Sequence, residues 1–522
     1  TYIAGSLGGY KVNIGTASSI ARLDIYDGAE LYSGKTADGH YMNISSGNTI
    51  NLYGSGAINL DTAIQDGFNH FGTDRVINIG SDNTFNLAAR TAEQLAANTY
   101  NRRGSDGSQF SALHIGDMGS NNTFVLNSDI ANNKADKLVI SSTAAGHNYI
   151  KISYDPTIFG GGKATDATKT LVVEAATGAN SGNLQGIFTG AASDIGVYSW
   201  TPTVKQEGDN WYIVGSAKTN TDTPSTTVKT GKTMSNALLS TFRLINNDLL
   251  KRMGELRFNP NNAGVWLRTY TGESDLKGGG GQRYIVIQGG LDKLKQEPGG
   301  KRFTGIALEH INSANTFENG TGSSKIYDIG VYQSWLADSG HYYDVVGKLY
   351  RTSNTMNIAD SNGMPVQGEY KGWAYGMSLE YGYRKELGKG YFAIPQIEFT
   401  YRHVAGLNYT TSNHIDINQK AYDSLVGRAG LTIGRKYNND SQIYLTANIL
   451  RELIANVKLS ANDSFGGSFK ESMSGKETWY NLAIGATFKN GKKNDWYMEL
   501  ERDFGSSCNN KWQVLLGTRW SW

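Results

Sequence analysis

Few residues in this sequence combine the type and the spacing that catalysis requires. The segment G-D-M-G-S from Gly116 differs from the G-D-S-G-S of secreted serine proteases at the nucleophile, because Met118 has no hydroxyl group. The segment F-G-G-G-K-A at Phe159 lacks both the spacing of a phosphate-binding loop and the Ser or Thr that would follow Lys163. We therefore expect that the chain is not an enzyme, apart from one self-cleavage reaction considered below.

Metal and redox chemistry also have few candidate residues. The chain has 8 histidines, and His40, His70, His114 and His147 are spread across unrelated segments. The single cysteine, Cys508, excludes an intrachain disulfide and a C-x-x-C motif. We expect no metal, no cofactor and only a structural place in a turn for Cys508.

The composition is typical of strands and turns. Among 522 residues there are 64 glycines and 30 tyrosines but only 7 prolines. The formal charge of +2 gives no global field that would favour nucleic acid as a partner. No apolar run approaches the ~18 residues of a membrane helix, so a β-barrel is the only way for the chain to cross a bilayer. Thr1 starts without a leader, and we expect any secretion signal to be removed or to precede it.

The C-terminal half alternates with a period of two. The segment from Asn510 to Trp522 places mostly apolar side chains at even positions and small or polar ones between them. This pattern is typical of a transmembrane barrel strand that ends in an aromatic belt. About twelve such segments follow Gly264, an even number that lets an antiparallel sheet close. They are centred near Val265, Ile285, Ile306, Ile329, Val345, Met377, Ile397, Leu431, Leu445, Ile484, Met498 and Val514.

The same alternation separates lipid-facing from lumen-facing residues. Apolar side chains at odd positions from Trp373 to Tyr381 would face lipid, whereas Glu380 and Arg384 would face the lumen. In the next strand Phe399 would face lipid and Glu398 the lumen. A charge near the middle of the lipid face would cost about 2–4 kcal/mol. We therefore expect the strand carboxylates inside the barrel.

The N-terminal half has a different rhythm. From Thr1 to about Asn133, short apolar strands alternate with turns, which predicts the stacked rungs of a parallel β-helix. From Ala135 to Gly215 the strands are longer, as in a cap that closes the last rung. A linker follows from Thr219, and apolar spacings of three and four predict a helix from about Val228 to Gly254. Because much of this helix is polar, we place it in a hydrated lumen.

Several separate motifs carry a family resemblance. They are N-N-K-A-D-K-L-V-I from Asn132, D-N-W-Y-I-V from Asp209, L-L-K-R-M-G-E-L-R-F-N-P from Leu249, W-L-A-D-S-G-H-Y-Y-D from Trp335, V-Q-G-E-Y from Val366, S-L-V-G-R-A-G-L-T-I-G from Ser424 and R-W-S-W from Arg519. With these motifs the chain resembles monomeric autotransporters of type V secretion, of the pertactin and AIDA adhesin type. The first two motifs resemble the autochaperone region of that family, and the others resemble its translocator unit.

The resemblance implies a fold and a role for each part of the chain. Residues 1–134 would form a right-handed parallel β-helix passenger, 135–218 an autochaperone cap, 219–254 a linker and lumen helix, and 255–522 a 12-stranded antiparallel translocator barrel. The barrel would lie in the bacterial outer membrane and support export of its own passenger, an adhesin-type stalk, to the cell surface. We expect a monomer whose partners are outer-membrane lipid and lipopolysaccharide, the barrel-assembly machinery, periplasmic chaperones and a host or other cell. Trp512, Trp520 and Trp522 would form the C-terminal assembly signal.

Lumen residues acquire two candidate roles from the resemblance. The carboxylates Glu309, Asp344, Glu380 and Glu398 would hold the helix through Arg243, Lys251 or Arg252. Some family members also release the passenger when an Asn side chain attacks its own backbone carbonyl. Alignment on K-R-M-G at Lys251 places that Asn pair over Asn247 and Asp248, whereas the pair in this chain is Asn246 and Asn247, one residue earlier.

Three functions are compatible with the sequence and the family resemblance. The first is an autotransporter whose passenger stays attached as a surface stalk. The second is a self-cleaving member, cut at Asn246, Asn247 or Asp248, that releases an effector. The third is a porin-like channel with an extracellular ornament, in which the helix would not seal the pore.

Overall fold

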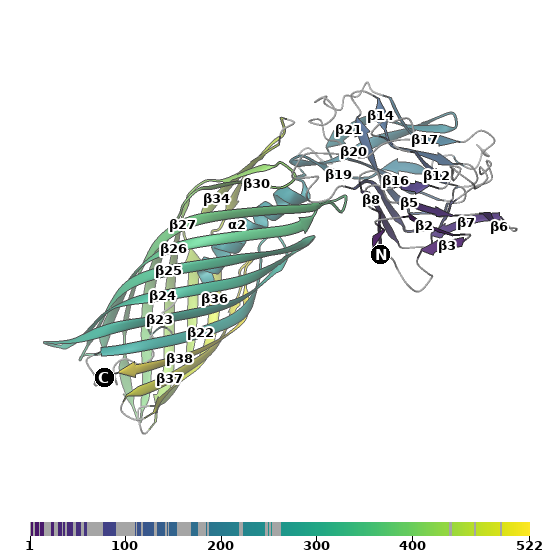
Figure 1. Cartoon of the computed structure of the whole chain (residues 1–522). Coiled ribbons are helices and arrows are strands. Elements are labelled where there is room, and N and C mark those ends of the chain that lie inside the picture. Colours follow the sequence, from purple (N-terminus) through teal and green to yellow (C-terminus); the bar gives the residue numbers. More distant parts are fainter. Residues whose placement is uncertain are drawn as a thin grey trace.

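The chain folds into a barrel and a β-helix joined at one mouth of the barrel (Figure 1). The computed structural model describes residues 263–437, 441–463, 466–490 and 493–521 of the barrel, and 223–245, 249 and 252 before it. Toward the N-terminus it describes 2–3, 6–9, 11–14, 22–25, 30–33, 35–36, 39–44, 48–53, 57–59, 77–89, 110, 112–115, 118–129, 133–140, 144, 146–153, 169–175, 184 and 187–218. The C-terminal strand ends at the mouth away from the β-helix (Figure 1).

Twelve long antiparallel strands close into the barrel, which confirms the predicted fold of this half. The first and last strands pair, and so do the sixth and seventh, so the sheet has no free edge. Each predicted strand centre falls within one of these strands. They are β22 (Ala263–Asp275), β23 (Gly281–Glu297), β24 (Gly300–Phe317), β25 (Gly320–Ala337), β26 (His341–Ala359), β27 (Pro365–Tyr383), β29 (Tyr391–Val404), β32 (Tyr422–Lys436), β33 (Gln442–Glu452), β36 (Thr478–Asn490), β37 (Asn494–Phe504) and β38 (Asn510–Ser521), with the short β28 (Lys385–Gly388) paired to β29.

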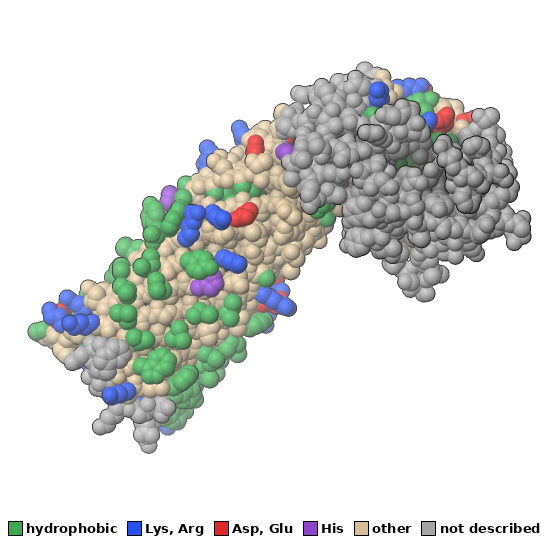
Figure 2. All heavy atoms as spheres, in the orientation of Figure 1, with side chains coloured by type: hydrophobic (Ala, Val, Ile, Leu, Met, Phe, Trp, Pro, Cys, Tyr) green, Lys and Arg blue, Asp and Glu red, His purple; other side chains and the backbone are tan. Residues whose placement is uncertain are grey.

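The barrel wall is apolar outside and polar inside. Trp373, Met377 and Phe399 are each half or more exposed on the outer wall, whereas Glu380 and Glu398 are buried in the lumen. Figure 2 shows apolar side chains scattered in a band along the visible side of the barrel. The alternation read from the sequence is therefore confirmed, and it keeps these carboxylates away from lipid.

A small sheet covers part of the mouth that faces the β-helix. It has the order β30 (Leu407–Thr410), β31 (Asp416–Gln419), β34 (Asn456–Asn462) and β35 (Ser468–Ser474). The first hairpin belongs to the connection from β29 to β32, and the second to the connection from β33 to β36. Long loops on one rim thus extend the wall over the lumen.

The N-terminal half is a parallel β-helix, as predicted. Strands one rung apart pair in parallel and in register, for example Phe85 with Phe124. Buried asparagines stack at one corner, where Oδ1 of Asn83, Asn122 and Asn148 each accepts the backbone N–H of the residue one rung earlier. The strands are β1 (Tyr2–Ile3), β4 (Arg22–Ile25), β8 (Thr49–Tyr53), β11 (Thr84–Ala89), β13 (Thr123–Asp129), β16 (Asn148–Ser153) and β18 (Phe188–Gly190) in one sheet; β3 (Lys11–Ile14), β7 (Gly39–Ile44) and β10 (Ile77–Ile79) in a second; β2 (Ser6–Gly9), β5 (Glu30–Ser33) and β9 (Ala57–Asn59) in a third; and β12 (Ala112–Ile115), β15 (Lys137–Ile140) and β17 (Thr170–Ala175) in a fourth, with β6 (Lys35–Thr36) and β14 (Lys134–Ala135) as short additions.

A hairpin closes the last rung of the β-helix. Strand β21 (Asn210–Lys218) pairs antiparallel with β17, and β20 (Tyr198–Glu207) pairs with β21 and with β19 (Ser193–Ile195). Trp211 is buried against Phe188 in the core that the rungs share. Because an antiparallel hairpin cannot continue the parallel stack, it ends the exposed edge.

One helix, α2 (Thr226–Leu244), runs from the β-helix into the barrel (Figure 1). It contacts barrel strands β24 and β26 and the rim strands β31 and β34, and most of its side chains are buried. The described helix ends at Leu244, and its C-cap is Ile245. Of the remaining residues up to Gly254, where the predicted helix ends, only Leu249 and Arg252 are described, and both are helical. Among the described residues, no helix has the length and hydropathy to span a bilayer.

Candidate functional site

The lumen around the end of α2 is the candidate site, because charged side chains of the barrel converge there on the helix segment. Two of the predicted carboxylates contact that segment. Glu380 accepts the backbone N–H of Leu249 at 2.9 Å, and Asp344 pairs with Arg252 at 2.5 Å. The Tyr497 hydroxyl also donates to the Arg252 carbonyl at 2.9 Å. These bonds join β26, β27 and β37 to the chain that follows the helix.

The other two predicted carboxylates contact barrel residues instead. Glu309 faces Lys348 at 3.3 Å, and Glu398 accepts from Arg428 at 2.8 Å. Arg428 also approaches Glu380 at 3.4 Å. Because a buried carboxylate needs a partner, these pairs stabilise the wall rather than the helix. Among the described residues, no direct contact with the helix or with the segment that follows it supports the helix-holding role predicted for Glu309 and Glu398.

Arg243 on the helix finds a partner that the sequence reasoning missed. Its guanidinium pairs with Glu477 at 3.2 Å and donates to the Gly475 carbonyl at 2.5 Å. Glu477 also accepts from Lys277 and Ser507, which lie in two other rim loops. Burial would raise the pKa of the Glu477 carboxyl, but these bonds and the Arg243 charge outweigh burial and lower that pKa to about 2. Only the long connection from β33 to β36 brings Glu477 here, and no local pattern signals it.

The N-terminus of α2 meets the β-helix cap and the barrel at one carboxylate. Asp194 accepts the N–H of Thr226 at 3.0 Å and the N–H of Ser361 at 3.1 Å. Ser361 belongs to the loop between β26 and β27, and its Oγ accepts the Asp194 N–H at 2.7 Å. An acidic group at a helix N-terminus also stabilises the helix dipole. The sequence reasoning did not single out Asp194, because the contact joins segments more than 160 residues apart.

The same loop contacts two rungs of the β-helix. Lys151 donates to the Ser361 carbonyl at 2.7 Å, and Asn86 donates to the Asn362 carbonyl at 2.6 Å. Burial, together with the nearby Asp194 charge, raises the pKa of Asp360 to about 7. Burial also lowers the pKa of Lys151. The loop therefore carries buried polar groups that depend on the docked β-helix for their partners.

The rim hairpin of β34 and β35 adds a second contact to the cap. Asp463 accepts the Val197 N–H at 2.9 Å, and the Tyr198 hydroxyl donates to the Ser468 carbonyl at 2.6 Å. The rings of Tyr198 and Phe469 meet edge to face, with centroids 6.2 Å apart. Two separate loops of the barrel thus hold the cap.

The remaining predicted residues are placed as follows. Trp512 and Trp520 lie on the outer wall, with exposed fractions of 41% and 40%. Arg519 of the R-W-S-W motif pairs with Asp292 of β23 at 2.5 Å. Met118 lies in the β-helix core, and Cys508 lies in the turn before β38. Asn246, Asn247, Asp248, Lys251 and Trp522 lie outside the described residues. Within the described part of the chain, no group of His, Cys, Asp and Glu could hold a metal ion.

Comparisons with known proteins match both halves of the chain. The Autotransporter beta-domain model matches residues 265–501, and the Pertactin model matches residues 91–215. The probable autotransporter YcgV of Escherichia coli K12 is 27% identical over 80% of this chain and 47% of its own length. The serine protease EspC of E. coli O127:H6 is 26% identical over 76% of this chain and 30% of its own length. The solved beta domain of the Bordetella autotransporter BrkA is 26% identical, with 50% of this chain and 100% of that chain covered and a TM-score of 0.43.

The relatives correct the expectation that the chain is not an enzyme. EspC, SepA, EatA and EspP are all named serine proteases, at 24–28% identity. That expectation was based on catalytic motifs that are missing from these 522 residues, and it was extended from them to the whole protein. The chain, however, spans less than half the length of the curated relatives it matches.

Proposed function

We propose that this chain is an autotransporter of the pertactin type, with its barrel in the bacterial outer membrane and its passenger at the cell surface. The barrel supports export of its own passenger and is then closed by α2. The observation that carries the proposal is the path of the chain. It runs from the cap at one mouth, through the lumen as α2, and into the first barrel strand. A passenger that has crossed the barrel leaves its connecting segment in this position.

We propose the domain boundaries given by the sequence. Residues 1–134 are the β-helix passenger, 135–218 the autochaperone cap, 219–254 the linker and lumen segment, and 255–522 the translocator. The antiparallel pairing of β17 with β21 supports a capping role for the second part. The contacts of Leu249 and Arg252 with Glu380 and Asp344 support a sealing role for the third.

The protein is a monomeric outer-membrane protein, and we propose more specific partners. The exposed apolar wall suits outer-membrane lipid and lipopolysaccharide. Trp512 and Trp520, with Trp522, would be read by the barrel-assembly machinery after delivery by periplasmic chaperones. The β-helix would meet a host surface or another cell. We propose no nucleic-acid partner, because the formal charge is only +2.

The passenger has two candidate roles. The first is an adhesin-type stalk, supported by the match of residues 91–215 to Pertactin. The second is a serine protease passenger, supported by relatives such as EspC and SepA. Within these 522 residues Met118 leaves the G-D-M-G-S segment without a nucleophile. Labelling of the full-length protein with a fluorophosphonate probe separates the two, because only a serine hydrolase with an activated nucleophile reacts.

We propose that the passenger stays attached to the barrel. The Asn pair is one residue away from the position that self-cleaving relatives use, so the attacking amide would miss its geometry. Intact mass of the protein from purified outer membranes should give one species that contains both parts. Two species, divided at Asn246, Asn247 or Asp248 and restored to one by Asn-to-Asp replacement of the pair, would instead establish the self-cleaving alternative.

A further inference from the structure

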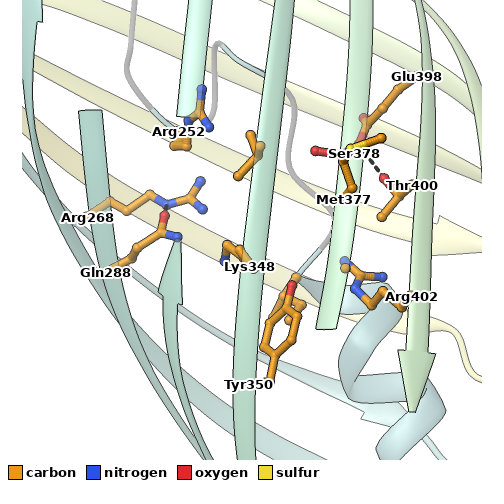
Figure 3. A pocket seen from close by; sticks show the side chains of 13 residues that line it. Arg252, Arg268, Gln288, Lys348, Tyr350, Met377, Ser378, Glu398, Thr400 and Arg402 are labelled. Atoms are coloured by element: carbon orange, nitrogen blue, oxygen red, sulfur yellow. Dashed lines mark hydrogen bonds between the residues drawn. The ribbon is translucent and has the colours of Figure 1, made fainter. Parts of the chain in front are cut away.

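A small cavity in the lumen lies beside the end of α2 (Figure 3). Its volume is ≈ 30 Å³, room for about two water molecules or one atomic ion. Four of its lining side chains are cationic and one is acidic. They are Arg252, Arg268, Lys348 and Arg402, and the acid is Glu398.

Most of these charges have partners of opposite sign in the wall. Arg252 pairs with Asp344, and Lys348 faces Asp328 at 3.4 Å as well as Glu309. Glu398 is already paired with Arg428. The single acid of the lining is therefore not available to the cations of the cavity.

Arg268 differs from Arg252 and Lys348. It is 1% exposed, and its Nε donates to the neutral Gln288 side chain at 2.7 Å. Both of its terminal nitrogens, Nη1 and Nη2, have no hydrogen-bond partner in the described structure. In Figure 3 its guanidinium points into the space between Arg252 and Lys348. A buried guanidinium is costly unless its lost hydration is replaced by hydrogen-bond acceptors or an opposite charge, and no described protein group supplies these to Nη1 and Nη2.

We propose that this cavity binds one small monovalent anion, of the halide class, on the Nη groups of Arg268. Wall carboxylates meet the charges of Arg252 and Lys348, whereas an anion on Arg268 would compensate a guanidinium to which the described residues bring no carboxylate. The volume of the cavity suits an atomic ion better than a tetrahedral oxyanion. The anion lies where Arg252 of the lumen segment meets the barrel wall. It therefore helps to hold that segment and makes lumen closure sensitive to halide.

The test measures unfolding of the folded full chain in detergent by heat-modifiable gel mobility. Sodium gluconate is replaced by sodium chloride or bromide at constant ionic strength, with sodium sulfate as a further arm. If the cavity is half-saturated with halide at about 100 mM, then 1 M halide raises the ratio of folded to unfolded protein by about tenfold. Sulfate should give no such shift beyond its general effect on the surface.

Two variants on β23 form a matched pair. Gln288→Glu places a carboxylate beside Arg268 and should abolish the halide dependence without loss of stability. Gln282→Glu adds the same charge on the same face of the strand, where the side chain bonds Thr241 and Ser313 instead, and should keep the dependence. Equal halide dependence in wild type and Gln288→Glu, or none in wild type, overturns the proposal. Crystals grown in bromide provide an independent readout, since an anomalous peak beside Nη1 and Nη2 supports the site and water alone there refutes it.

Discussion

Asp194 is the residue at which the passenger, the helix and the barrel meet. Its carboxylate accepts from Thr226 at the helix start and from Ser361 in a barrel loop. Nearby, Asp360 is partly buried, and its Oδ1 accepts the backbone N–H groups of Asn362 and Met364. Desolvation, and after it the negative charge of Asp194, disfavours the ionised form of Asp360, which explains its raised pKa.

This pair predicts a pH-dependent docking of the cap. The pKa of Asp360 is raised from 3.8 to about 7 in the folded state, so the folded state binds the proton more tightly than the unfolded state. The contribution of Asp360 to stability is therefore greatest below pH ~4 and is lost as pH rises toward about 7. Hydrogen exchange at the amides of Ser361, Asn362 and Met364, corrected for intrinsic rates, should show stronger protection at pH 5 than at pH 8.

The matched variants for this prediction are Asp360→Asn and Asp209→Asn. The first keeps an acceptor oxygen but cannot ionise, so protection should become independent of pH. The second changes an exposed aspartate in the turn between β20 and β21 and should behave as wild type. A persistent pH dependence in Asp360→Asn would assign the effect to another group, with Asp194 and Lys151 as the neighbours to examine.

Among the elements, α2 combines a polar composition with nearly complete burial. Thr233, Ser235 and Thr241 donate their hydroxyls to backbone carbonyls four residues earlier, and Thr241 also accepts from the Gln282 side chain of β23. Gly231 leaves room for the rim, because an added Cβ would lie 2.8 Å from Ile417 Cδ1. A polar helix thus fits a polar lumen by satisfying itself and approaching the rim closely.

Removal of α2 should open the barrel. A variant without residues 226–244 loses the side chains that fill the lumen, and its single-channel conductance in planar bilayers should rise well above that of wild type. A protease site placed in the linker at 219–222 is the control, since cutting there releases the passenger but leaves α2 in place and the channel closed. Equal conductance of the deletion variant and wild type would favour the porin-like alternative.

Considered as a whole, the molecule has separate cores in its two halves. Trp211 belongs to the β-helix core, whereas the barrel residues Trp266 and Phe303 form a different cluster. The contacts between the halves at the mouth are hydrogen bonds, one ring pair, and the packing of Val197 and Tyr198 of the cap against helix and rim residues. Loss of the β-helix core should therefore leave the barrel folded.

Trp211→Ala tests this independence. Removing a buried aromatic side chain costs about 3–5 kcal/mol, so the passenger should become sensitive to trypsin on whole cells. The barrel should keep its heat-modifiable mobility. Tyr212→Ala, one residue later on the opposite and less buried face of β21, is the control and should stay resistant. Loss of the folded barrel in Trp211→Ala would show that the two halves fold as one unit.

The sequence alone determined the β-helix, the presence of a cap, the twelve barrel strands and the faces of their side chains. These follow from local periods, because a side chain two residues along a strand returns to the same face. The lumen position of Glu380 and the lipid position of Trp520 are such cases. Tertiary structure alone decided which charges meet. Glu477 pairs with Arg243 and Arg519 with Asp292, whereas Arg268 pairs with no carboxylate of the described residues. Barrel closure and long loops bring together residues that no period relates.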